Sequence, residues 1–104
     1  MPGLDPLIHP PTRLQLMSAL TAVADAEFST LRAALGVSDS VLSKQISALV
    51  GAGYVRSRKG SHEGRRTTWV GLTDLGHRAL REHVAALRDL IEVVDRPAGT
   101  NHTK

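Results

Sequence analysis

The chain contains no cysteine, which excludes a disulfide framework and any site built on thiolate ligands or a thiolate nucleophile. Aromatic residues are equally scarce, with one phenylalanine, one tyrosine and one tryptophan in 104 residues. No apolar run approaches the about 20 residues that a membrane-spanning helix needs, and the N-terminus lacks the basic and then apolar pattern of a signal peptide. These absences favour a single cytoplasmic domain without a membrane partner.

Signatures of catalysis are also missing from the sequence. There is no Ser–His–Asp order, no phosphate-cradling glycine loop and no nucleophile turn, so we expect no enzyme. The five histidines, at positions 9, 62, 77, 83 and 102, show no paired ligand spacing. We therefore expect no cofactor and no metal site within one chain, while a metal site shared between two chains stays open.

The basic residues are concentrated in one short segment. Residues 56–66 carry five basic side chains and one acidic side chain, whereas the other residues carry eight basic and nine acidic ones. The net charge of +3 is therefore a local patch on an otherwise balanced chain. Such a patch is typical of a surface that binds a polyanion, with a solvated loop as the simpler alternative.

Three helices are predicted in the first half of the chain. Pro10 opens one over 11–24, and a second begins at Ser29 as its N-cap and ends at Gly36. A third, over about 39–52, has Ser38 as its N-cap. Its expected core positions are Leu42, Ile46, Leu49 and Val50. Its opposite face is short-chained and polar, so it can approach base edges in a DNA groove closely.

A β-hairpin is predicted next, with strands over 54–59 and 66–72 and the turn residues GSHEG between them. Val55, Val70 and Leu72 are expected to face the core. Trp69 lies on the face opposite Val70, where it would cover the hairpin or stack on an arginine. This packing use is favoured over direct stacking on a nucleic-acid base.

A long last helix is predicted over 74–95, capped by Thr73 and Asp74. Its apolar residues alternate spacings of four and three, which is a heptad-like seam. A helix of this length extends about 33 Å, more than a small domain can cover. We therefore favour dimerisation along the seam, and the alternative is that the seam packs on its own domain.

The order of these elements is that of a winged helix-turn-helix, and the sequence resembles the MarR- and ArsR-type bacterial repressors at the matching places. The similarity is carried by LIHPPTRLQLMSAL, LGVSDSVLSKQISALVGAGYV and RRTTWVGLTDLGHRAL, and it spans residues 4–95. The resemblance implies a small stand-alone regulator with a mainly α fold and a small β-hairpin (α+β), that is, a winged helix-turn-helix with a long C-terminal dimerisation helix. The expected organisation is a flexible N-terminal arm at 1–9 with one turn of helix at 5–9, a DNA-binding domain at 10–73, the dimerisation helix at 74–96 and a disordered tail at 97–104.

The site residues of the family can be carried over by position. Those that would read the DNA major groove are Ser38, Asp39, Ser40, Ser43, Lys44 and Ser47. Those of the wing that would bind phosphates are Arg56, Arg58, Lys59, Arg65 and Arg66. Those of the dimer interface would be Leu80, Val84, Leu87, Ile91 and Val94.

These features predict a sequence-specific regulator of transcription, usually a repressor in this family, that binds a roughly palindromic double-stranded DNA operator as a homodimer. Such a protein would be cytoplasmic, and associated with the bacterial nucleoid when bound to DNA. Two other functions stay open: a winged-helix protein–protein adaptor without specific DNA binding, and an ArsR-type sensor of a metal or a ligand. A small-molecule effector could enter beside Met17, Leu20 and the last helix, and control by protein concentration alone is an equal alternative.

Overall fold

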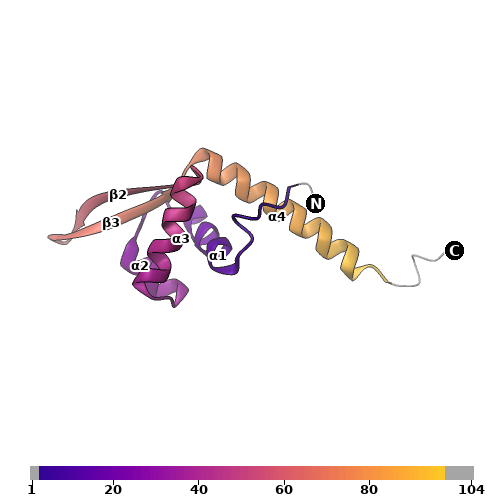
Figure 1. Ribbon diagram of the computed structural model, residues 1–104, viewed down its shortest axis with the longest axis horizontal. Coiled ribbons are helices and arrows are strands. Elements are labelled where there is room, and N and C mark those ends of the chain that lie inside the picture. Colours follow the sequence, from indigo (N-terminus) through magenta and orange to yellow (C-terminus); the bar gives the residue numbers. More distant parts are fainter. Residues whose placement is uncertain (1–2, 98–104) are drawn as a thin grey trace.

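Four α-helices and a three-stranded antiparallel sheet make up residues 3–97, the part of the chain that this computed structural model describes (Figure 1). The elements are, in order, α1 (Pro11–Ala19), the 3-10 helix η1 (Leu20–Ala22), β1 (Ala26–Glu27), α2 (Phe28–Leu35), α3 (Asp39–Gly51), β2 (Val55–His62), β3 (Arg65–Leu72) and α4 (Asp74–Asp95). The β2–β3 hairpin and α4 project in opposite directions from the other helices, and the long dimension is 67 Å. The predicted winged helix-turn-helix with a long C-terminal helix is confirmed; only the first residue of the predicted tail lies among the described residues.

One hydrophobic core joins the three short helices to the base of the sheet and to α4. Its fully buried side chains include Ile8, Leu16, Met17, Leu20, Leu42, Leu49 and Val70. Leu42, Ile46 and Leu49 face this core from α3, as predicted. The expected core position of Val50 is wrong, because this side chain is 42% exposed. At 100° per residue Val50 lies past the edge of the buried stripe of α3.

Two helix boundaries differ from the prediction because of a strand that the sequence does not signal. The helix expected to reach residue 24 ends at Ala19 and is followed by the 3-10 helix η1 as far as Ala22, and residues 26–27 are extended because they pair with β3. The chain then turns directly into α2, with Glu27 as N-cap. The predicted N-cap Ser29 is therefore wrong; its hydroxyl donates to the Glu27 carboxylate at 3.1 Å.

The hairpin is longer, and its turn tighter, than predicted. β2 continues to His62, so the turn consists of Glu63 and Gly64 alone rather than five residues. Both have positive φ, at 52° and 79°, which is the conformation that two-residue hairpin turns require. The two strands pair over eight positions each, and this gives the wing its length.

The segment before α1 is part of the domain, so the prediction of a loose arm is wrong for residues 4–9. Ile8 is completely buried, and Ile8 and His9 donate backbone hydrogen bonds to the carbonyl oxygen of Asp5 in the predicted turn. The Asp5 carboxylate accepts from the hydroxyl of Tyr54 at 2.5 Å, and the Asp5 backbone N–H donates to His83 Nδ1 at 2.9 Å. This segment therefore ties the start of the hairpin to α4.

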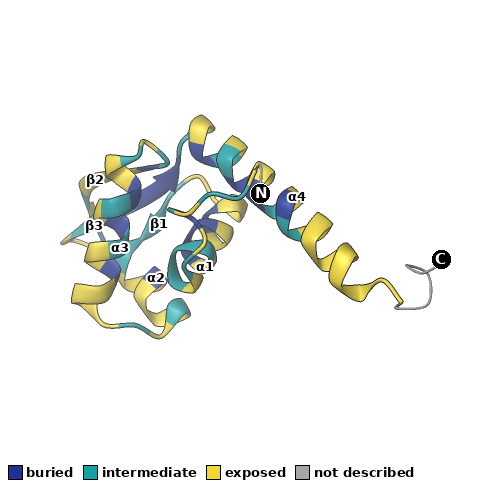
Figure 2. Cartoon of the chain, turned by 45° about the vertical axis from the view of Figure 1, so that its right-hand side comes forward, coloured by how far each residue is buried: buried dark blue, intermediate teal, exposed yellow. Residues whose placement is uncertain are grey.

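Helix α4 begins and ends at the predicted residues, and its two halves have different environments (Figure 2). Thr73 caps it, accepting from the N–H of Gly76 at 3.0 Å. The first half, with the turn that follows it, packs on the domain through the buried residues Gly76, Leu80, His83 and Ala86. From Arg88 onward the second half leaves the domain and is exposed up to Asp95.

Candidate nucleic-acid interface

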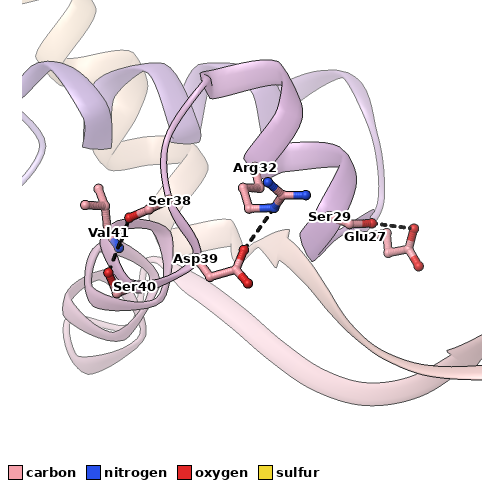
Figure 3. Close-up of polar contacts among 7 residues, drawn as sticks. All are labelled: Glu27, Ser29, Arg32, Ser38, Asp39, Ser40 and Val41. Atoms are coloured by element: carbon pink, nitrogen blue, oxygen red, sulfur yellow. Dashed lines mark hydrogen bonds and ion pairs between the residues drawn. The ribbon is translucent and has the colours of Figure 1, made fainter.

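The exposed face of α3 carries five of the six predicted groove-reading residues. Asp39, Ser40, Ser43, Lys44 and Ser47 are all exposed, and the sixth, Ser38, is the exposed N-cap. The Ser38 hydroxyl accepts from the N–H of Val41 at 3.2 Å and lies 3.3 Å from the Ser40 hydroxyl (Figure 3). The Ser38 hydroxyl thus caps the N-terminus of the helix, whereas the hydroxyls of Ser43 and Ser47 lie about one and two turns further along.

Contacts from the rest of the domain hold α3 in place without covering that face. Gly36, at φ 67°, ends α2 and allows the sharp turn into α3. On another side of α3, Arg13 of α1 donates to the side chain of Gln45 at 2.6 Å and to the carbonyl oxygen of Leu7 at 3.2 Å. The helix therefore presents its small polar face on a rigid support.

The register of the hairpin divides its basic residues between two faces. We call the face that continues toward the core the inner face; it carries Ser57, Lys59 and Ser61 on β2 and Arg66, Thr68 and Val70 on β3. Lys59 and Arg66 are therefore on the inner face, while Arg65 and Arg58 are on the outer face with Trp69. Lys59 donates to the hydroxyl of Thr68 at 3.1 Å.

The inner face of the hairpin and the polar face of α3 meet in one shallow groove. Its lining residues are Phe28, Ser43, Ile46, Ser47, Ser57, Lys59 and Thr68. Two hydroxyls of the predicted recognition helix and the ammonium group of the wing thus border the same depression. The arrangement can meet base edges with α3 and phosphates with the wing at the same time.

Two of the five predicted phosphate-binding residues lie beside a carboxylate of the protein itself. Arg56 donates to the carbonyl oxygens of Leu72 and, at 2.8 Å, Ala24, and lies 3.4 Å from the carboxylate of Asp25. Arg58 lies 3.5 Å from the same carboxylate, with its guanidinium 5.7 Å from the centre of the Trp69 ring. Asp25 was not part of the predicted patch, and it offsets the charge of these two arginines.

The remaining wing cations are better placed for a polyanion. Arg65 and Arg66 follow the two-residue turn and are exposed, and their side chains have no hydrogen-bond or ion-pair partner among residues 3–97. With Lys59 they form the basic part of the wing that the protein itself does not neutralise. Phosphate binding by all five wing residues stays a prediction, and it is best supported for Lys59 and Arg66.

Trp69 has the packing role that was favoured for it. It is half-buried on the outer face, with the Arg58 guanidinium over its ring and the His62 ring edge-on at 5.7 Å. Gly60 lies diagonally across on β2, and a Cβ there would be 2.9 Å from the Trp69 ring. The tryptophan is thus enclosed by its own hairpin rather than offered to a base.

The predicted dimer residues are divided between the two halves of α4. Leu80 is buried in the domain, and Val84 and Leu87 are half-buried. Ile91 is 56% exposed and Val94 is 73% exposed. Leu90 and Val93, which the predicted seam omitted, add to the exposed apolar surface of the second half.

Two interactions at this site were missed from the sequence. Arg32, in the last turn of α2, forms an ion pair with Asp39 at 2.9 Å, and Asp25 holds Arg56 and Arg58. A basic residue seven positions before an acidic helix start was the available signal for the first. The second had no signal, since it depends on β1.

Metal and membrane sites were also sought among residues 3–97. No cluster of three or more histidine and acidic side chains there has the arrangement of a metal site. No helix in that range combines the length and apolar character that a membrane span requires.

The chain matches the family described as the winged helix DNA-binding domain over residues 12–91. Among solved structures it is similar to the transcriptional regulator homologue protein from Pyrococcus horikoshii OT3, with a TM-score of 0.81 and 27% identity over 86% of this chain and 89% of that chain. Two further structures show the same fold. The first is the PcaV transcriptional regulator from Streptomyces coelicolor, with a TM-score of 0.73 and 21% identity over 93% of this chain and 69% of that chain. The second is a MarR family transcriptional regulator from Silicibacter pomeroyi DSS, with a TM-score of 0.66 and 23% identity over 88% of this chain and 60% of that chain. No curated protein matches the sequence.

Proposed function

This chain belongs to the winged helix DNA-binding domain family, and from that membership we propose that it regulates transcription by binding a specific double-stranded DNA sequence as a homodimer. One observation carries the proposal: the small polar face of α3 and the basic inner face of the hairpin border the same groove. An adaptor that binds proteins has no need for a row of exposed serines beside unneutralised cations. The Pyrococcus horikoshii relative, described as a transcriptional regulator homologue, supports the same function.

The two parts of this surface would contribute different terms to binding. Lys59 and Arg66 would bind phosphates and supply affinity that depends on salt and hardly on sequence. The hydroxyls and Lys44 on α3 would select sequence, since each good base contact contributes about 1–3 kcal/mol of discrimination. Repression needs only occupancy of the operator, for which these contacts suffice, and it is the outcome that we propose.

Homodimerisation is supported by the second half of α4. Leu90, Ile91, Val93 and Val94 are between 39% and 73% exposed over little more than one helical turn. Exposed apolar residues at this density are typical of a helix that packs on another helix. A second copy packed on α4 would place two α3 helices on one duplex, so the operator would be roughly palindromic.

The DNA-binding proposal can be tested by fluorescence anisotropy with a labelled duplex from upstream of the gene and a shuffled duplex of the same composition. We expect tighter binding to the native duplex, with an affinity that falls steeply as salt rises. Equal binding to both duplexes would contradict sequence specificity at this operator. Absence of binding to either at low salt would support the adaptor alternative.

The dimer proposal is tested by Ile91→Asp, with Glu92→Gln as the matched control on the same turn. Ile91 is 56% exposed, so a charge there should leave the domain folded while disrupting an interface. We expect a monomer in sedimentation and a weakened affinity for the operator, because two linked copies gain from effective concentration. A dimer that survives Ile91→Asp would mean that the interface lies elsewhere.

A further inference from the structure

The ion pair between Arg32 and Asp39 lies at the edge of the DNA-facing surface rather than in the core. Arg32 is in the last turn of α2 and Asp39 is the first residue of α3, so the pair bridges the turn between the two helices (Figure 3). The Nε of Arg32 lies 2.9 Å from Oδ1 of Asp39. The side chains are 44% and 77% exposed, so their pairing adds little to the stability of the fold.

The geometry of the pair leaves most of the arginine unused. The guanidinium group has five N–H donors, and Asp39 occupies the one on Nε. Neither Nη group of Arg32 has a hydrogen-bond partner among residues 3–97. Asp39 therefore contacts one edge of the guanidinium group and leaves the two Nη groups open to a ligand.

The same pair neutralises the negative charge of Asp39 at the start of α3. The N-terminus of a helix attracts anions, and Ser38 and Ser40 place hydroxyls there. Asp39 by itself would repel a DNA phosphate from this position. Arg32 cancels that charge, and it brings donors that suit phosphate geometry to the N-terminal end of α3.

We propose that Arg32 is a further DNA-contacting residue, which binds a backbone phosphate through its Nη groups and is positioned for this by Asp39. This inference rests on the proposed function, because it assigns a phosphate contact within the same DNA-bound complex. It adds a phosphate contact at the N-terminal end of α3 to those proposed for Lys59 and Arg66 on the wing. The position of the helix in the groove would then be fixed by phosphate contacts from both α2 and the wing.

The test is the salt dependence of operator affinity for the wild type and for Arg32→Gln, Asp39→Asn and the double variant. Loss of one phosphate contact lowers the slope of log affinity against log salt by about 0.9. The affinity of Arg32→Gln should therefore fall about 3.5-fold less than that of the wild type when salt rises from about 50 to about 200 mM. The loss should appear equally on the native and shuffled duplexes, since a phosphate contact carries no sequence information.

The double variant separates a contact from simple neutralisation of Asp39. If Arg32 touches phosphate, the slope of Arg32→Gln/Asp39→Asn should lie below that of Asp39→Asn by a similar amount. If Arg32 only cancels the aspartate, the two slopes will be equal, and the inference is wrong. Arg96→Gln, at the far end of α4, is the matched control and should keep the wild-type slope.

Two further readouts keep the outcome clear. The midpoint of thermal unfolding reports whether Arg32→Gln is still folded. Arg32→Lys retains the positive charge, so it should keep the wild-type slope even if Arg32→Gln does not fold. A wild type that binds no duplex would contradict the proposed function itself. A wild type that binds with a slope unchanged in Arg32→Gln would contradict this inference alone.

Discussion

The sharpest consequence of the hairpin register is that two adjacent arginines should not be equivalent. Arg66 pairs with Ser61 and shares the inner face with Lys59, which borders the groove beside α3. Arg65 pairs with His62 and shares the outer face with Trp69. If the duplex lies along α3 and the inner face, Arg66→Ala should remove a phosphate contact that Arg65→Ala leaves in place.

The size of the effect follows from counterion release. Arg66→Ala should lower the slope of log affinity against log salt by about 0.9, which is a factor of about 3.5 between about 50 and about 200 mM salt. Lys59→Ala should lower it by a similar amount. Arg65→Ala should change the slope by less than half as much. All three side chains are exposed, so none of these changes should shift the midpoint of thermal unfolding appreciably.

Fluorescence anisotropy over a salt series, with one native duplex and all three variants, measures this asymmetry directly. Equal slopes for Arg65→Ala and Arg66→Ala would mean that the tip enters the DNA with both arginines, and that the inner face is not the contact surface. A larger loss for Arg65→Ala would reverse the assignment of the faces and place the duplex against Trp69. Either result would refute the reasoning from strand register.

Three other predictions concern the folded domain. Ile8→Ala should lower the free energy of unfolding by about 2–5 kcal/mol in urea titrations at fixed protein concentration, whereas a loose arm would give less than about 0.5 kcal/mol. Burial and the neighbouring His9 lower the pKa of His83, so as the pH falls this side chain is protonated in the unfolded chain before it is protonated in the folded one. The free energy of unfolding should therefore fall as the pH drops below 6.5, and that fall should be absent in His83→Gln. Gly76→Ala should prevent normal folding as judged by circular dichroism, because the added Cβ would overlap the carbonyl oxygen of Tyr54, and a native spectrum and midpoint would contradict this.

Local signals were sufficient for the helices at the DNA-facing end and for α4. Ser38 and Thr73 mark helix starts that the structure confirms, because an N-cap hydroxyl satisfies a backbone N–H two or three residues away in sequence. The polar and apolar faces of α3 follow from helical periodicity in the same way. Only Val50, at the edge of the stripe, was misplaced, since periodicity gives the direction of a side chain but not how far the core extends.

Features that depend on distant residues were not predictable. β1 consists of two residues, Ala26 and Glu27, and it exists because β3 is there to pair with it. Asp25 reaches Arg56 and Arg58 only because β1 carries it to the hairpin. Counting charges along the chain therefore overstated the basic patch, because it could not include a carboxylate that is thirty residues away in sequence and in contact in space.

The two interpretations of the α4 seam, self-packing and dimerisation, turn out not to exclude each other. The domain covers the helix as far as Ala86, and the seam residues beyond Leu87 are exposed. A single repeat of apolar residues can therefore serve two surfaces in succession along one helix. Sequence periodicity has no marker for the point at which the first surface ends.

The base of α4 determines what a dimer could do with DNA. Thr73 donates its N–H to the carbonyl oxygen of Tyr54 at 3.1 Å and its hydroxyl to Gly53 at 2.6 Å, which ties the start of α4 to the end of α3. Asp5 adds a second tie, because it binds both the Tyr54 hydroxyl and His83. With its base held at these points, α4 leaves the domain in one fixed direction relative to α3. The distance between two α3 helices in a dimer would then be set by the fold rather than by a flexible linker, and the operator would tolerate only one spacing of its half-sites.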